Sequence, residues 1–243
     1  FTPPYSYFNN KDYKNVSIEE KYKFIEYHKW RFNALWYTPL VGNLVLHAKI
    51  QYGFLGYYNP DIGQSPFERF YLGGDGMAGF NFDGREIVGL RGYETNSLPS
   101  PGPSGFNIGG TVFDKYTLEL RYPVSLNPNA TIYLLGFAEG GNAWINFSEF
   151  NPFSTMRSAG FGVRIFLPMF GMLGLDWGYG FDEVPYHPLL NENRIQFTIG
   201  YNRRPRRRYI LHTAPSAIFR RARIEHRAPE HRHHLRQPAL ARP

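Results

Sequence analysis

The sequence predicts an all-β fold, an antiparallel β-barrel that crosses a membrane with its strands. Three observations predict it: apolar and polar residues alternate from residue 27 onward, charges lie at mid-strand on the polar faces, and short connections alternate with long ones. No run approaches the roughly 18 apolar residues of a transmembrane helix, whereas a transmembrane strand needs only about 9–11 residues. The chain has no cysteine, so it carries neither disulfides nor thiol chemistry.

The first two predicted strands, residues 27–40 and 43–54, place large apolar side chains on one face and polar side chains on the other. The apolar faces hold Trp30, Phe32, Ala34 and Trp36, then Leu44, Leu46, Ala48, Ile50 and Tyr52. The polar faces hold Lys29, Arg31 and Asn33, then His47, Lys49 and Gln51. We interpret His47 as a polar residue of the barrel lumen rather than as a ligand or a base.

The third predicted strand, residues 115–122, sets Tyr116, Leu118, Leu120 and Tyr122 against Thr117, Glu119 and Arg121. Three more follow at 131–144, 156–167 and 172–182. The last, 193–201, sets Ile195, Phe197, Ile199 and Tyr201 against Arg194, Gln196 and Thr198. Asp176 and Asp182 are read as polar residues of the lumen, and Arg157 as a strand-end residue that reaches water by snorkelling.

Alternation alone fits an ordinary soluble antiparallel sheet equally well, but the lengths of the connections favour a barrel in an outer membrane. Residues 38–43, 123–130 and 168–171 are short turns, while 55–114, 145–155 and 183–192 are longer. Outer-membrane barrels have short periplasmic turns and long external loops. Seven strands do not close such a barrel, because bacterial barrels have an even number of strands. Residues 1–6, FTPPYS, are read as the end of another strand, with the missing portion lying upstream.

Residues 203–243 differ from the body of the chain in charge. Residues 1–202 hold 15 Lys and Arg against 18 acids, a net charge of −3, whereas residues 203–243 hold 12 Arg against 2 acids, a net charge of +10. We therefore predict a barrel portion over 1–202 and a disordered Arg-rich tail over 203–243. Alternatives for the tail are a patch for anionic lipid or nucleic acid, or a metal site at His231, His233 and His234.

The longest connection carries the most specific motif. Leu90, Arg91, Gly92 and Tyr93 follow the segment FERFYLGGDG at 67–76. Together they resemble the Val-Arg-Gly-Phe/Tyr motif, and the segment before it, of BamA-type outer-membrane assembly factors in the bacterial surface antigen superfamily. The resemblance covers residues 1–202 and implies the C-terminal half of a 16-stranded barrel, with this loop folded into the lumen.

The resemblance also implies partners for the arginine of the loop. In the family it meets acids on the next two strands, which correspond here to Glu119 and Glu139. Glu139 stands where the family commonly has aspartate, in a Phe-x-Asp-x-Gly pattern that here runs from Phe137 to Gly141. A longer carboxylate still accepts a two-pronged guanidinium bond. The alternative is that both glutamates are merely solvated residues of the lumen.

The function that the resemblance implies is insertion of β-barrel proteins into the outer membrane of a Gram-negative bacterium. It implies a weak seam between the first and last barrel strands, a periplasmic portion that binds other assembly subunits, and unfolded outer-membrane proteins as clients. The seam residues would be Arg194, Gln196, Phe197, Thr198, Ile199, Gly200 and Tyr201. No catalytic, metal or phosphate-binding motif occurs in the sequence. We therefore expect no enzyme activity, cofactor, metal or nucleic acid, and lipid as a partner.

Two alternatives to assembly stay open at this stage. A secretion transporter of the same superfamily would keep the barrel and the loop but pass a single partner protein through its lumen. A passive porin would need no internal arginine. Several upstream periplasmic repeats would indicate assembly, two would indicate secretion, and none would indicate a porin.

Overall fold

A computed structural model describes residues 1–9, 11–76, 85–99, 105–127, 129–185 and 194–200. The chain divides into two units, Phe1–Arg203 and Arg204–Pro243, and the fold below is that of the first. The predicted tail at 203–243 and Tyr201 lie outside the described residues. In the described part of the chain, no helix is both long and apolar enough to cross a bilayer.

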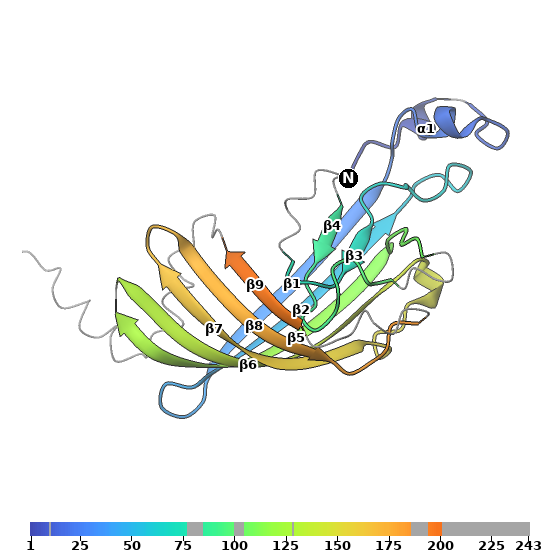
Figure 1. The fold of residues 1–243 in the computed structure, drawn as a ribbon. Helices are drawn as coiled ribbons and strands as arrows, with labels where there is room; N and C mark the ends of the chain where they lie inside the picture. Colours follow the sequence, from blue (N-terminus) through green and yellow to red (C-terminus); the bar gives the residue numbers. More distant parts are fainter. Residues whose placement is uncertain (10, 77–84, 100–104, 128, 186–193, 201–243) are drawn as a thin grey trace, which may run out of the picture. The chain divides into compact units, whose positions relative to one another are not determined.

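Seven antiparallel strands form one curved sheet (Figure 1). They are β1 His28–Pro39, β2 Val45–Gly56, β5 Val112–Asn127, β6 Ala130–Trp144, β7 Met156–Leu167, β8 Gly171–Gly180 and β9 Arg194–Gly200. Neighbours in the sheet follow this chain order, and every pair is antiparallel. The predicted all-β antiparallel class is confirmed. The sheet is open, and within the described residues β1 and β9 are its edges.

The sheet exposes apolar side chains and buries polar ones, the reverse of a sheet in a soluble protein. Leu118 and Ile195 are 52% and 76% exposed, whereas Glu119 and Gln196 beside them are 6% and 8% exposed. Polar groups therefore gather on the concave face and large apolar groups on the convex face, as the alternation predicts. A barrel wall needs this arrangement, because lipid surrounds it and water fills its lumen.

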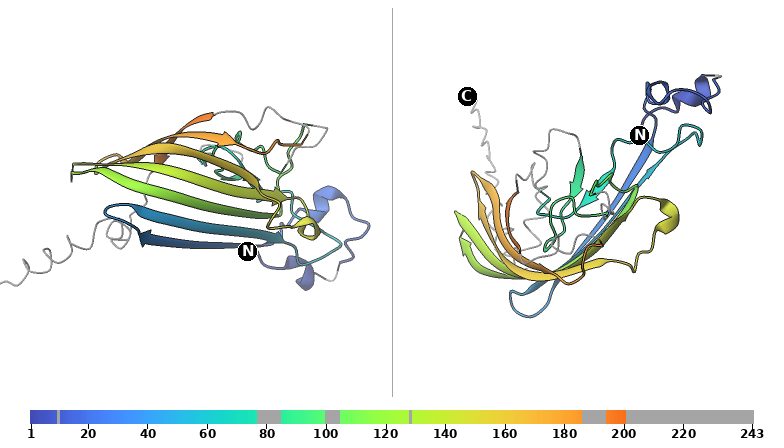
Figure 2. Two further views of the ribbon diagram at one scale, coloured as in Figure 1. Left: turned by 90° about the horizontal axis from the view of Figure 1, so that it is seen from below. Right: turned by 45° about the vertical axis from the view of Figure 1, so that its right-hand side comes forward.

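The long connection between β2 and β5 lies on the concave side of the sheet (Figure 2). It contains two three-residue strands, β3 Phe70–Leu72 and β4 Glu86–Val88, which pair in parallel. The sequence predicted no regular structure there, because three residues are too few to show a period. The hydrophobic core lies between this loop and the sheet and comprises Leu55, Phe70, Leu72, Val88, Leu90, Tyr93, Leu98, Phe113, Ala143 and Val184.

The beginning of the chain corrects the sequence prediction. Residues 1–6 are not the end of a strand; they lead into helix α1, Tyr5–Phe8, and helix α2 follows at Ile18–Lys21. The carboxylate of Glu26 accepts hydrogen bonds from the backbone N–H and the hydroxyl of Ser6, at 2.8 and 2.7 Å. This distant side-chain contact holds α1, a helix too short to be stable alone.

The predicted turn at 123–130 is also shorter than expected. β5 continues to Asn127 and β6 begins at Ala130, with a register shift between Pro123 and Ser125. Proline has no N–H to donate to the sheet, so a bulge accommodates it within a continuing strand.

Candidate functional site

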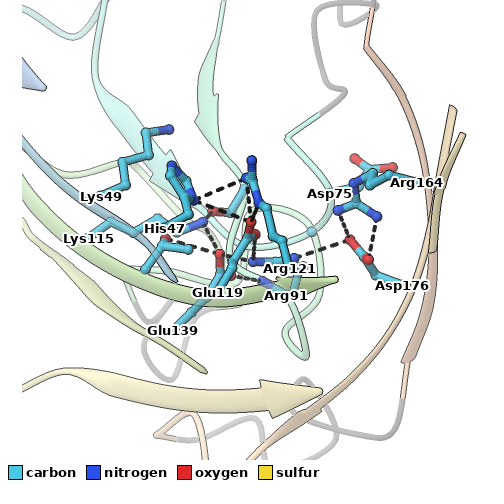
Figure 3. Close-up of a pocket in the computed structure, with 13 residues that line it drawn as sticks. His47, Lys49, Asp75, Arg91, Lys115, Glu119, Arg121, Glu139, Arg164 and Asp176 are labelled. Atoms are coloured by element: carbon cyan, nitrogen blue, oxygen red, sulfur yellow. Dashed lines mark hydrogen bonds and ion pairs between the residues drawn. The ribbon is translucent and has the colours of Figure 1, made fainter. Parts of the chain in front are cut away.

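Arg91 lies at the centre of an ion cluster on the concave face of the sheet (Figure 3). Its Nη2 is 2.6 Å from Glu119 Oε1 and 2.8 Å from Glu139 Oε1, and its Nη1 is 3.4 Å from Asp176 Oδ2. These acids come from β5, β6 and β8, so one arginine connects three strands of the wall. We call these four residues the loop clamp.

Further contacts fix the position of the arginine. Its backbone N–H donates to Glu139 Oε2 at 2.9 Å, so this carboxylate holds both the main chain and the side chain. The guanidinium carbon lies 3.6 Å from the centre of the Phe137 ring, a cation–π contact. Arg91 is 7% exposed, and a charge this deeply buried is stable only with such partners.

Each acid of the loop clamp has a second cationic partner from the wall. Arg121 bonds Glu119 through Nε and Nη2 at 2.8 and 2.5 Å. Lys115 lies 3.0 Å from Glu139 and also donates to the backbone carbonyl of Gly89 in the loop. Arg164 forms a two-pronged pair with Asp176, both bonds being 2.6 Å. A cavity of about 230 Å³ opens beside these groups, and its wall also includes His47 and Lys49.

Glycines on β8 allow the tip of the loop to approach the sheet. Gly92 has φ of +86°, and a Cβ on it would lie 2.8 Å from the backbone N of Gly180. On β8, a Cβ at Gly178 would lie 2.9 Å from Gly92 N, and one at Gly180 would lie 2.9 Å from Gly92 O. Loop backbone and sheet backbone therefore meet without side chains between them.

Replacing Gly178 with Ala should displace the loop tip, because the new methyl group would overlap the backbone of Gly92. Overpacking of this kind costs about 1–3 kcal/mol of unfolding free energy. Urea unfolding in lipid vesicles measures the loss. Gly136→Ala on β6 is the matched control, since the nearest atom to its added Cβ is 4.0 Å away. Equal stability of the two variants would contradict the close approach.

Tyr93 fixes the far end of the motif and is fully buried. Its hydroxyl donates to the carbonyl of Arg157 at 2.8 Å and accepts from the N–H of Asp182 at 3.2 Å. Its carbonyl accepts a bond from Gln196 on β9 at 3.4 Å. Burial raises the pKa of Tyr93 to about 12, so the hydroxyl keeps its proton at neutral pH and remains a donor.

A second set of ion pairs attaches the loop to the sheet, and here the loop supplies the acid and the sheet supplies the bases. Glu86 on β4 lies 2.5 Å from Lys29 and 2.8 Å from Arg31, both on β1. Lys29 also pairs with Glu68 of the loop at 2.9 Å. We call Glu86, Lys29 and Arg31 the β1 clamp. The loop thus offers an acid to basic residues on β1 and a base to acids on β5, β6 and β8.

The structure brings together most of the motif residues singled out in the sequence. Arg91 meets Glu119 and Glu139, Leu90 lies in the core, and Phe137 lies against the guanidinium. Gly141 lies close to β5, because a Cβ there would lie 2.9 Å from the backbone O of Asp114, and it would lie 3.4 Å from the Leu72 side chain of the loop. Of the last strand, the structure pairs the β9 backbone with β8 and places Gln196 against Tyr93.

The sequence alone did not identify three residues of the site: Asp176, Arg164 and Glu86. The alternation predicts Asp176 only as a polar residue of the lumen, and no pattern in the sequence singles out Arg164. The signal that could have found Asp176 is its spacing from Gly178 and Gly180, an acid and two glycines at successive lumen-facing positions. Glu86 carried no signal, because its partners lie more than fifty residues upstream. Across the described residues, no group of three or more His, Cys, Asp or Glu could hold a metal ion.

A curved antiparallel sheet with an apolar convex face, and with a charged loop bound to its concave face, defines the wall of a transmembrane β-barrel. Residues 15–202 match the Omp85 superfamily domain, and the chain belongs to this superfamily. Membership places it in the outer membrane of a Gram-negative bacterium.

A solved structure shares this fold: BamA from Haemophilus ducreyi lacking POTRA domains 1–3. The match has a TM-score of 0.51 and 19% sequence identity, and it covers 71% of this chain and 34% of that chain. The present chain therefore spans about a third of the BamA chain that it matches. No curated protein matches the sequence.

Proposed function

We propose that this protein inserts β-barrel proteins into the outer membrane, with the described residues forming the C-terminal part of the barrel wall. The observation that carries the proposal is the loop clamp. Arg91 bonds three carboxylates on β5, β6 and β8, which stiffens this part of the wall from the inside. Omp85 membership supports insertion or transport of outer-membrane proteins in general terms.

The physical task is to give an incoming strand its hydrogen-bond partners before it enters hydrocarbon. An unpaired backbone N–H or C=O costs several kcal/mol in lipid, so a client strand gains most by adding to an existing sheet edge. The edge strand β9, Arg194–Gly200, offers unpaired backbone groups in the described part of the sheet. Gly200 at its end would weaken pairing there and favour opening.

The partners in this proposal are unfolded outer-membrane proteins, lipid, and other assembly subunits that bind through a periplasmic portion of the protein. The loop residues Leu90, Arg91, Gly92 and Tyr93 position the wall, and Glu119 and Glu139 hold them. No step of the proposed function is catalytic, and none uses a cofactor or a metal.

A reversible crosslink tests whether the seam opens. A disulfide between Ile195→Cys on β9 and a cysteine on the barrel strand that closes against it should abolish client insertion into liposomes, and reductant should restore it. Ile195 suits the test because it is 76% exposed on the convex face and lies outside the loop clamp. The chain has no native cysteine to interfere.

The matched control is the interior crosslink between Ile195→Cys and Trp177→Cys. These residues are direct partners across β8 and β9, so the bond locks a pairing that insertion does not need to break. We expect this variant to insert clients normally. If the seam-locked protein also inserted clients, lateral opening would be wrong, and secretion through the lumen would be the better assignment.

A further inference from the structure

The connection between β6 and β7 does not enter the lumen. Residues 145–155 lie on the convex side of the sheet, opposite the long loop (Figure 2). This connection includes the short 3-10 helix η2, Phe147–Glu149. Two of its phenylalanines pack against the outward-facing Phe54 on β2. The ring centres of Phe147 and Phe150 lie 5.9 and 6.2 Å from the ring centre of Phe54.

A hydrogen bond ties the other end of this connection to the wall. Asn142 on β6 donates from Nδ2 to the carbonyl of Ser154 at 2.8 Å. Trp144, where β6 ends, packs edge-on against Phe150 with ring centres 5.0 Å apart. Residues 145–155 are therefore held against the outside of the sheet at both ends.

The exposed surface of this connection carries two large aromatic side chains among mostly uncharged polar residues. Phe147 is 64% exposed and Phe153 is 91% exposed, while residues 145–155 contain one acid, Glu149, and no Lys or Arg. Asn146 donates to the Glu149 carboxylate at 2.7 Å. Large exposed aromatic groups with little charge suit the interface between lipid tails and headgroups, where aromatic residues are enriched.

The aromatic surface is continuous with the lipid-facing wall. The rings of Phe54 and of Phe32 on β1 pack with their centres 6.3 Å apart. Trp30 on β1 is the direct cross-strand partner of Phe54 and is 57% exposed. Such a band of aromatic residues marks the membrane interface in outer-membrane barrels. The connection extends this band beyond the strands.

We propose that residues 145–155 form a lipid-contacting foot that lies in the interface of the outer leaflet, with Phe147 and Phe153 inserted among the lipids. The foot would give the barrel wall a lateral hold on the bilayer close to β1, β2 and β6. This inference rests on the membrane location of the chain and not on the proposed assembly function.

Site-specific quenching tests the foot in the intact protein, reconstituted in lipid vesicles. Ser148→Cys carries an environment-sensitive fluorophore between Phe147 and Glu149 without removing an aromatic residue. We expect a blue-shifted emission that lipids with brominated acyl chains quench and aqueous iodide does not. A label at Phe106→Cys, in the connection between β2 and β5 and 80% exposed, should show the reverse pattern. Iodide quenching at Ser148 that matches this control would overturn the proposal.

Two further variants separate lipid contact from simple folding. In the labelled Ser148→Cys background, Phe147→Ser with Phe153→Ser should abolish quenching by brominated lipid while the heat-dependent gel mobility of the barrel stays unchanged. Asn142→Leu removes the bond to Ser154 and should make the label accessible to iodide. If brominated lipid still quenched the label in the double Phe variant, these aromatic residues would not insert the foot.

Discussion

Arg91→Leu should give the largest loss of stability in the chain. The change leaves Glu119, Glu139 and Asp176 close together and without their shared cation. Removing one partner of a buried ion pair typically costs about 3–5 kcal/mol. Each acid keeps its second cation, Arg121, Lys115 or Arg164, so we expect a loss near the lower end of this range, from the lost bonds between loop and wall. Unfolding in urea from lipid vesicles measures this loss, and client insertion in the same vesicles should fall with it.

Two comparisons make the Arg91 result specific. Arg91→Lys keeps the charge but lacks the planar fork that bonds two carboxylates at once, so we expect an intermediate loss. Glu86→Gln in the β1 clamp should cost less than Arg91→Leu, because Glu86 is 23% exposed and Arg31 is 44% exposed, so water partly screens this cluster. An Arg91→Leu variant as stable as Glu86→Gln would show that the loop clamp does not hold the wall.

Leu118→Arg should give the second large effect, through lipid rather than through the lumen. Leu118 is 52% exposed on the convex face of β5, next to the buried Thr117. An arginine facing lipid costs about 2–4 kcal/mol near the bilayer midplane and about 0–1 near the interface. For Leu118→Arg, the free energy of unfolding in lipid vesicles should therefore fall by about 2–4 kcal/mol.

The control for Leu118 lies further along the same strand. Leu126 is 44% exposed and lies one residue before the end of β5, where a long side chain reaches water by snorkelling. Leu126→Arg should therefore cost much less than Leu118→Arg. Equal costs would place the midplane elsewhere on β5, and no cost at either position would contradict a lipid-facing convex surface.

The strands were predictable because their signal is local. Period-two alternation in 156–167 and 193–201 locates β7 and β9 to within about a residue, since each strand must present one face to lipid and one to the lumen. The partners of Arg91 on β5 and β6 were also accessible from sequence, but only through the resemblance of the motif. Nothing in the alternation alone connects a loop residue with a particular carboxylate.

The missed features depend on contacts between distant parts of the chain. Asp176 is 85 residues from Arg91, and only the curvature of the sheet brings β8 to the loop. β3 and β4 exist because they pair with each other on the concave face, although neither has a length that produces a period. The strand end predicted at residues 1–6 was wrong because the contact that holds α1, between Ser6 and Glu26, spans twenty residues and leaves no local pattern.

The distances in sequence between the loop and its partners have a consequence for the order of folding. Gln196 reaches Tyr93 across 103 residues, so the loop reaches its final position only after the last strand has been made and paired. Contacts this far apart must overcome a large loss of chain entropy before they give any stability, and folds dominated by them form slowly. During that delay, the carboxylates of β5, β6 and β8 have only Arg121, Lys115 and Arg164 as cationic partners, and no bond from the loop connects the three strands. Docking of the loop is therefore expected to be a late step that locks a slowly formed sheet.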